Sequence, residues 1–237
     1  MKRITAEKLN HIESLIKSGN DRYAIDELTS NNFFNEAFKK YPLNNTPELV
    51  AMKISLIDTT NSTNLSRILG NKNYIVKGKK VKRKVFTLSD LINKITATPN
   101  FDERIRRGDI SLVSELTKWS KEHGANIMSF FSKYCLYHNY ICYNKDDFSI
   151  FDSVLQNNLG KYITEQEFKQ LFPNRKIRTN STIVKAISNE VSKMKNNCDY
   201  ESYRELIDNI LKLRKITQAE VPKIRRKLDL FVWYLNR

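Results

Sequence analysis

The sequence predicts an all-α fold, arranged as one large domain or two small lobes, and three observations lead to the all-α prediction. Apolar residues recur at helical spacing along most of the chain. Only six glycines and five prolines occur in 237 residues, so long stretches lack a helix breaker. Hydrophobic residues make up 40% of the chain, enough to bury a substantial core. We expect residues 1–237 to form a single unit, with approximate lobes 47–160 and 1–46 plus 161–237.

The first expected elements are helices. Residues 5–18 place their apolar side chains on one side, and Thr5 is a plausible N-cap. Residues 20–40 are expected to form one or two further helices. The next helix runs to about residue 60 and starts at Pro47, since proline is favoured at the first helical position.

The stretch 73–86 alternates apolar and basic residues around Lys-Gly-Lys, a pattern that indicates a short β-hairpin. A basic, solvated loop is the alternative. The strongest local run of positive charge lies in or beside it: Lys72, Lys77, Lys79, Lys80, Lys82, Arg83 and Lys84.

The remainder of the chain is expected to be helical. One helix begins at Asp152, and the others span 87–97, 109–122, 126–140, 163–171, 179–197, 200–214 and 217–235. Thr87 and Asp90 form a capping-box pattern at the start of the first of these.

The charge balance predicts a polyanionic partner. Lys and Arg number 41 against 26 Asp and Glu, which gives a formal net charge of +15 and a pI near 9.6. We expect nucleic acid, because basic proteins gain affinity from phosphate contacts. An anionic membrane surface and a ribosome remain open alternatives.

Three cysteines do not make a disulfide framework, and the N-terminus lacks the apolar region of a signal peptide. No window is apolar enough for a membrane span. We therefore expect a reduced, cytoplasmic, monomeric protein. Cys135, His138 and Cys142 could suggest zinc, but two of them fall on a buried helical stripe, so we expect no metal and no cofactor.

The densest chemical signal lies around Lys133 and Asp152. On the helix 126–140, Lys133 is expected to lie off the buried stripe, on a flank with hydroxyls and aromatic rings. Asp152 follows two apolar residues and precedes a helix, as an N-cap does, so the helix dipole favours its ionised form. A solvated lysine and a plain cap are the alternatives for the two residues.

This stretch resembles the helix-hairpin-helix DNA glycosylase superfamily, in particular its bifunctional, 8-oxoguanine-type members. The resemblance covers residues 110–160: a small residue and Lys133, an apolar helix, a polar turn, two apolar positions and Asp152, at a separation similar to that in the family. The family's hairpin has two close glycines. Here "EHGANIMSFFSK" contains only Gly124, so the hairpin is degenerate.

The resemblance implies a DNA glycosylase that flips a base out of double-stranded DNA and excises it, with or without AP-lyase activity. Lys133 would be the nucleophile that forms a Schiff base, and Asp152 the electrostatic and acid–base residue. The residues expected to contact the flipped base are Tyr137, Tyr140, Trp119 and His138, each with core packing as its alternative. The residues expected to contact DNA are Asn61, Ser62, Thr63, Asn64, Lys79, Lys80, Lys82, Arg83, Arg175, Lys176 and Arg178.

The target base stays open. It could be a damaged base, or a modified base in invading phage DNA, which would make the protein an antiviral defence enzyme. The competing hypotheses are a non-catalytic, basic helical nucleic-acid-binding protein and a structural protein whose charge is incidental.

Overall fold

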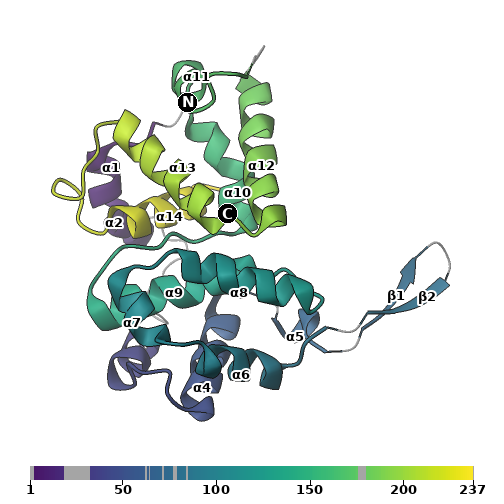
Figure 1. Ribbon diagram of the computed structural model, residues 1–237. Helices are drawn as coiled ribbons and strands as arrows, with labels where there is room; N and C mark the ends of the chain where they lie inside the picture. The colour runs from purple at the N-terminus through teal and green to yellow at the C-terminus, as the bar shows by residue number, and fades with distance from the viewer. Residues whose placement is uncertain are drawn as a thin grey trace.

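The structure is a computed structural model that describes residues 3–18, 33–61, 63, 65–70, 72–76, 79–83, 85–175 and 180–236. These residues are helical apart from one hairpin, so the predicted all-α class is confirmed (Figure 1). The helices before the hairpin are α1 (Ala6–Asn10), α2 (Ile12–Ser18), α4 (Pro47–Asn61) and α5 (Leu65–Ile68), and residues 33–40 are also helical. The helices after it are α6 (Leu88–Ala97), α7 (Phe101–Arg107), α8 (Ser111–Glu122), α9 (Met128–Tyr143), α10 (Ser153–Asn158), the 3-10 helix η1 (Leu159–Tyr162), α11 (Glu165–Leu171), α12 (Asn180–Asn197), α13 (Tyr200–Leu213) and α14 (Ile224–Tyr234).

Three predicted helix starts are confirmed, whereas the helix expected over 217–235 begins only at Ile224. The side chain of Thr5 accepts a hydrogen bond from the backbone of Lys8, and Pro47 is the first residue of α4. At α6, Thr87 and Asp90 form a reciprocal capping box. These caps satisfy N–H groups that the first turn of a helix leaves without a partner.

Some boundaries differ from the prediction. Residues 5–18 form two helices, because the backbone of His11, with φ −96° and ψ 4°, departs from helical angles. The helix expected over 126–140 begins at Met128 and continues to Tyr143. The sequence prediction left 98–108 unassigned, yet α7 lies there. Residues 20–32 lie outside the described residues.

The hairpin prediction is confirmed at the level of the backbone. Strands β1 (Lys72–Val76) and β2 (Lys79–Arg83) pair antiparallel, with Tyr74 opposite Val81. The hairpin projects from the helical body (Figure 1). Its base is closed by a hydrogen bond of 3.1 Å from the backbone N–H of Gly70 to the carbonyl of Phe86.

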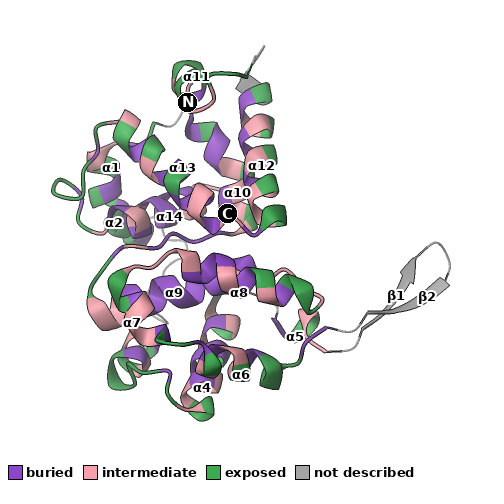
Figure 2. Cartoon of the chain, in the orientation of Figure 1, coloured by how far each residue is buried: buried purple, intermediate pink, exposed green. Residues whose placement is uncertain are grey.

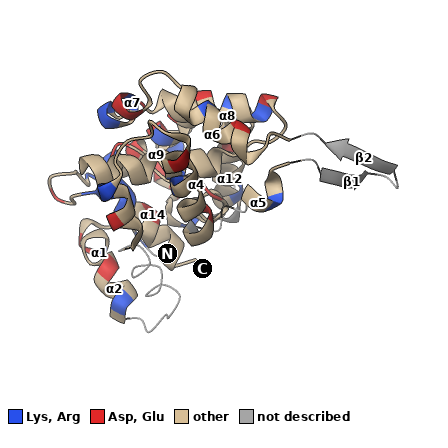
Figure 3. Ribbon diagram, turned by 90° about the horizontal axis from the view of Figure 1, so that it is seen from below, with Lys and Arg blue, Asp and Glu red and all other residues tan. Residues whose placement is uncertain are grey.

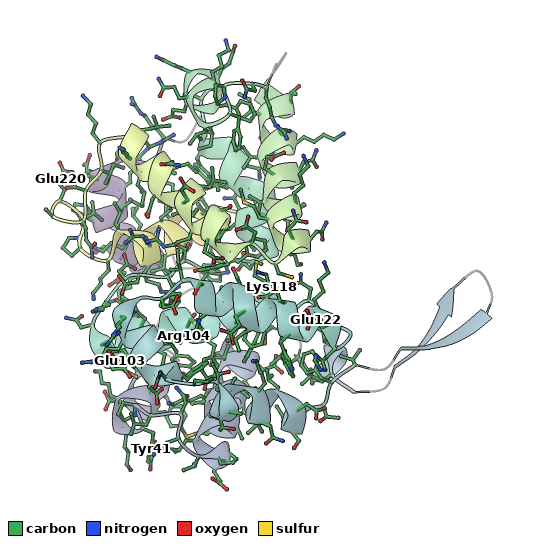
Figure 4. All side chains as sticks on the ribbon, viewed as in Figure 1. Tyr41, Glu103, Arg104, Lys118, Glu122 and Glu220 are labelled. Carbon is green, nitrogen blue, oxygen red and sulfur yellow. The ribbon has the colours of Figure 1, made fainter. Side chains whose placement is uncertain are left out.

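The helices form two lobes, which we call lobe A and lobe B. Lobe A comprises the described residues of 33–143, and lobe B comprises 3–18 and 153–236, with a connector of residues 144–152 between them. Figure 4 places Tyr41 at the far end of lobe A and Glu220 on a loop of lobe B.

These lobes differ from the predicted ones at two points. Residues 33–46 belong to lobe A, because the ring of Phe34 lies 4.6 Å from that of Tyr137 and Asn44 bonds to Asp102. Helix α10 belongs to lobe B, where it packs on α12 and α14. The expected pairing of the N-terminal helices with the C-terminal part holds, since α1 and α2 pack on α14.

Helix α9 is the central element of the core. It packs against α4, α7 and α8 within lobe A, and the connector and α14 cover its other side. Figure 2 shows most of its length as buried. None of the helices that the structure describes is both long enough and apolar enough to cross a bilayer.

Candidate functional site: a charged pocket between the lobes

A pocket of about 450 Å³ lies between the two lobes. That volume is in the range that holds small organic ligands. Lobe A contributes Thr60, Thr63, Leu65, Ile68, Asn126, Ile127, Ser129, Phe130, Lys133 and Tyr137. The connector and lobe B contribute Ile150, Asp152, Ser153, Val154, Leu155, Lys195, Arg226, Asp229, Leu230 and Trp233.

The structure brings Lys133 and Asp152 together in the wall of this pocket. The ammonium Nζ of Lys133 lies 3.8 Å from Oδ2 of Asp152, and their side chains are 8% and 15% exposed. This distance is too long for a hydrogen bond, so the interaction between the two groups is an electrostatic attraction. A cation and an anion therefore face the same enclosed space.

Asp152 is held by the start of α10. Its Oδ1 accepts a hydrogen bond of 2.9 Å from the backbone N–H of Leu155, which confirms the predicted N-cap. The backbone N–H of the preceding Phe151 donates to the hydroxyl of Ser132, the neighbour of Lys133 in α9. The connector is thus fastened directly to α9 at the point where the lysine projects.

Lys133 is more deeply buried than expected. Its side chain was expected off the buried stripe, on a flank with hydroxyls and aromatic rings, but the residue is only 6% exposed, which also excludes the alternative of a solvated lysine. The reason is that α9 lies between two layers, so it has no free face: Met128 and all residues from 130 to 139 are buried. Lys133 is therefore a buried pocket residue.

Two further cations line the pocket from lobe B. Lys195 comes from α12 and Arg226 from α14. The guanidinium carbon of Arg226 lies 5.4 Å from the centre of the Tyr137 ring, which is a cation–π arrangement. The pocket thus combines positive charge with an aromatic ring, which suits a flat anionic or polar ligand.

The turn between α4 and α5 forms another part of the wall, and Asp58 fixes it. Oδ1 of Asp58 accepts hydrogen bonds from the hydroxyl of Thr63 and from the backbone N–H of Leu65. Thr63 lines the pocket as a consequence. Of the expected neighbours in this turn, Asn61 ends α4, and Ser62 and Asn64 lie outside the described residues.

Sequence reasoning missed the contribution of α14. Arg226, Asp229, Leu230 and Trp233 follow the spacing i, i+3, i+4, i+7, so one stripe of this helix faces the pocket. The signal was present in the sequence as a stripe that mixes charge with apolar and aromatic residues. The pattern of this mixed stripe is less distinct in the sequence than that of the neighbouring, fully apolar stripe, which packs into the core.

His138 does not lie at the pocket. It is fully buried in lobe A, where its Nε2 is 2.9 Å from Nζ of Lys53 and 3.1 Å from Nδ2 of Asn44. Burial holds the pKa of His138 well below its ordinary value, so the ring is neutral. This is the core position that was the alternative for His138.

Trp119 and Tyr140 also lie outside the pocket lining. Trp119 packs on Phe86 and stacks on His123 beside the hairpin base, with ring centres 4.9 and 5.0 Å away. Tyr140 is half-buried with Nζ of Lys223 5.3 Å from its ring centre. Of the four residues expected to contact a base, only Tyr137 lines the pocket.

The residues expected to contact phosphate are spread over the molecule. Lys79, Lys80, Lys82 and Arg83 form most of β2, at the projecting hairpin. Arg175 is exposed in lobe B and pairs with Glu190, beside a second open cavity that Lys185 also lines. Lys176 and Arg178 lie outside the described residues.

Within the described residues, no group of three or more His, Cys, Asp or Glu side chains is placed to hold a metal ion. Cys135 is buried, and burial raises the pKa of its thiol far above the ordinary value. Cys142 lies near Lys53, with its sulfur 3.4 Å from the carbonyl of Phe38.

Fold and site together define the class: an all-α protein of two lobes with a charged pocket between them. Residues 8–147, more than half of the chain, match the family model HI_0787_N, which is described as an N-terminal domain. The chain therefore belongs to this family. The match ends within the connector, so it includes Lys133 and excludes Asp152, and the description names no activity. Searches of curated proteins and of solved structures found no match.

Proposed function

We propose that the protein is a DNA glycosylase of the helix-hairpin-helix type, which takes a flipped base into the pocket between its lobes and cleaves the N-glycosidic bond. The observation that carries the proposal is the pair of Lys133 and Asp152 in one pocket wall, 3.8 Å apart. An amine and a carboxylate at this spacing supply the two groups that the reaction needs.

The chemistry follows from the charges that develop. Breaking the bond between C1′ and the base builds positive charge on the deoxyribose, and the carboxylate of Asp152 stabilises it. For the attack, the ammonium of Lys133 first gives up one proton to solvent. The resulting amine attacks C1′, the bonding electrons leave with the base, and the second proton that the nitrogen loses passes to the base. Opening of the sugar ring then gives a Schiff base, from which β-elimination cleaves the strand.

The rest of the pocket supports binding of a base. Tyr137 and Trp233 present aromatic rings in its lining, and base–aromatic stacking is a common means of holding an extruded base. Thr63, in the α4–α5 turn, lines the pocket. In the proposed complex this turn fills the space that the base vacates in the duplex. The net charge of +15 favours the phosphate backbone.

The proposal is tested by incubating the protein with duplexes that carry a panel of damaged and modified bases, and by mass spectrometry of the bases released. Asp152→Asn should lower single-turnover release about 10²- to 10³-fold, since a charge that stabilises the transition state is lost. DNA affinity should change little. Asp199→Asn is the matched control, because Asp199 also caps a helix through its side chain but does not line the pocket.

The covalent step has its own test. Borohydride should trap the wild-type protein on DNA from which it releases a base, and Lys133→Gln should abolish trapping while Lys118→Gln, at an exposed site on α8, leaves it intact. Base release that survives in Lys133→Gln would make the enzyme monofunctional. If no base is released from any duplex, and the protein binds DNA with an affinity that decreases as salt increases, then it is a non-catalytic nucleic-acid-binding protein.

A further inference from the structure

Asp229 is a carboxyl group in the pocket wall for which the proposed reaction has no use. It lies on α14, between Arg226 and Trp233 on the stripe that faces the pocket, and it is 1% exposed. A carboxyl group this deep needs partners for both oxygens, because burying a polar atom without a hydrogen bond destabilises the fold.

Only one of its oxygens has a partner within the chain as described. Oδ2 accepts a hydrogen bond of 2.9 Å from the backbone N–H of Ile150, in the connector. Oδ1 is buried and makes no hydrogen bond to any described residue. Anchoring the connector accounts for one oxygen and leaves the other without a structural role.

The surroundings favour the protonated form of this carboxyl. Burial raises the pKa of Asp229 well above its ordinary value, and the negative charges of Asp146 and Asp152 act in the same direction. The N–H of Ile150 and the charge of Arg226 act against it and are outweighed. A neutral carboxyl that accepts at Oδ2 carries its proton on Oδ1, which is then a hydrogen-bond donor.

We propose that Asp229 is a specificity-determining residue, which selects the base by donating a hydrogen bond from Oδ1 to a carbonyl oxygen or an unprotonated ring nitrogen. This inference rests on the proposed function, since it names the part of the base that the pocket reads. It assigns the substrate class: a base with an acceptor on the edge that faces α14. An amino group at that position would meet a donor and be rejected.

Two variants separate recognition from anchoring. Asp229→Asn keeps an oxygen for the N–H of Ile150 and places an N–H donor where Oδ1 was. Asp229→Leu removes both interactions. Because a loss of stability lowers the response to all ligands alike, the readout is a ratio between two ligands.

Binding is measured without chemistry, on a duplex that carries a tetrahydrofuran abasic analogue with free base titrated in. The sequence has two tryptophans, and Trp233 lines the pocket while Trp119 does not, so quenching of Trp233 in a Trp119→Phe background reports occupancy. The probes form acceptor-deletion sets: hypoxanthine against purine and 7-deazahypoxanthine, and uracil against 2-hydroxypyrimidine.

The expected result is that one acceptor deletion weakens binding about tenfold in the wild type and in Asp229→Asn, and has no effect in Asp229→Leu. Equal sensitivity to every deletion in wild type and Asp229→Leu would overturn the inference, as would a lack of quenching by all five bases. Asp229-dependent binding by a protein that releases no base from DNA would leave the inference standing and remove the glycosylase proposal. Base release from DNA without Asp229-dependent selection would support the glycosylase proposal and overturn the inference about Asp229.

Discussion

Two lysines of lobe A are buried, and their neighbours give them different properties. Lys133 lies beside the carboxylate of Asp152 in the pocket. Lys53 is fully buried, and its Nζ lies 2.8 Å from the carbonyl of Leu43 and 2.9 Å from the neutral ring of His138. Since Nε2 of His138 accepts, the proton of the ring sits on Nδ1, which has no partner among the described residues. Lys53 therefore has acceptors around it and no carboxylate in direct contact.

The stability of the protein should depend on the titration of Lys53. Burial lowers the pKa of Lys53 to about 8 from an ordinary 10.5. Between these values the unfolded chain holds the proton and the folded one does not, so the free energy of unfolding rises with pH. The gain is complete above pH 10.5, shrinks as the pH falls from 10.5 towards 8, and is absent below 8. In urea titrations, stability of the wild type relative to Lys53→Met should rise by on the order of 3 kcal/mol over this window.

The matched control is Lys212→Met, at an exposed position of α13. Its stability relative to the wild type should not vary with pH between 8 and 10.5. A constant difference between Lys53→Met and the wild type would show that Lys53 has an ordinary pKa in the folded state.

Single residues could be predicted from sequence only where the signal is local. The N-cap at Asp152 was predicted correctly, because an N-cap is recognised from the few residues at the start of its own helix. The burial of Lys133 was not predicted, because it depends on the connector and on α14, and α14 is far from Lys133 in sequence. Asp229 was not found for the same reason: its partner Ile150 is distant in sequence.

At the scale of elements, the contact between η1 and α12 depends on a missing side chain. A Cβ on Gly160 would lie 2.6 Å from the Cα of Val184, closer than backbone atoms allow. Gly160→Ala should therefore push the two helices apart and destabilise the protein by about 1–3 kcal/mol, measured by urea or thermal unfolding. Asn157→Ala, at an exposed site on the adjacent α10, should change stability by less than about 0.5 kcal/mol. Equal effects would mean that the helices can separate without cost.

The α4–α5 turn offers a second prediction at this scale, and it rests on the proposed function. Asp58→Ala removes the acceptor that holds Thr63 and the backbone of Leu65. A displaced turn should reduce base release from duplex DNA about tenfold, while release from a single strand is spared, because no vacated space needs filling there. Asp90→Ala, which removes the capping carboxylate of α6, should leave the ratio of the two rates unchanged. A ratio that Asp58→Ala leaves intact would exclude this role for the turn.

Elements with both a cap and a long apolar stripe were predicted well, and short ones were not. Helix α7 is bounded by Asn100 and Gly108, whose backbones both lie in the left-handed region. On its inner face only Phe101 and Ile105 are buried. Its exterior is charged and gives little periodic signal: Glu103, labelled in Figure 4, forms ion pairs with Arg106 and Arg107. Two buried residues are too few to distinguish a short helix from a loop.

At the scale of the whole molecule, the chain starts in lobe B, passes through lobe A and returns to lobe B. Lobe B is built from both ends of the sequence, and Arg214 fastens them through a hydrogen bond of 3.0 Å to the carbonyl of Ile4. Sequence periodicity identifies helices but says nothing of which helices meet. The pocket arises from that pairing. Lys133, Asp152, Tyr137 and Thr63 could be named from the sequence, while the walls that α12 and α14 contribute could not.

Positive charge is distributed over several elements of the molecule. Figure 3 shows Lys and Arg on α2, α5, α7 and α8. The hairpin adds a basic strand that is separate from the helical body, and the bond from Gly70 to Phe86 closes its base. Charge in the hairpin can therefore be altered without touching the pocket.

Replacing Lys79, Lys80, Lys82 and Arg83 by Gln should weaken duplex binding and reduce its salt dependence. The slope of log affinity against log salt should fall by about 0.9 for each side chain that contacts a phosphate. The single-turnover rate of base release at saturating protein should not change, because the pocket is intact. The control carries the same change in charge at Lys8, Lys17, Lys39 and Lys40, which are exposed and lie outside the pocket lining. If both variants lower the slope equally, the hairpin acts only through net charge and does not grip the duplex.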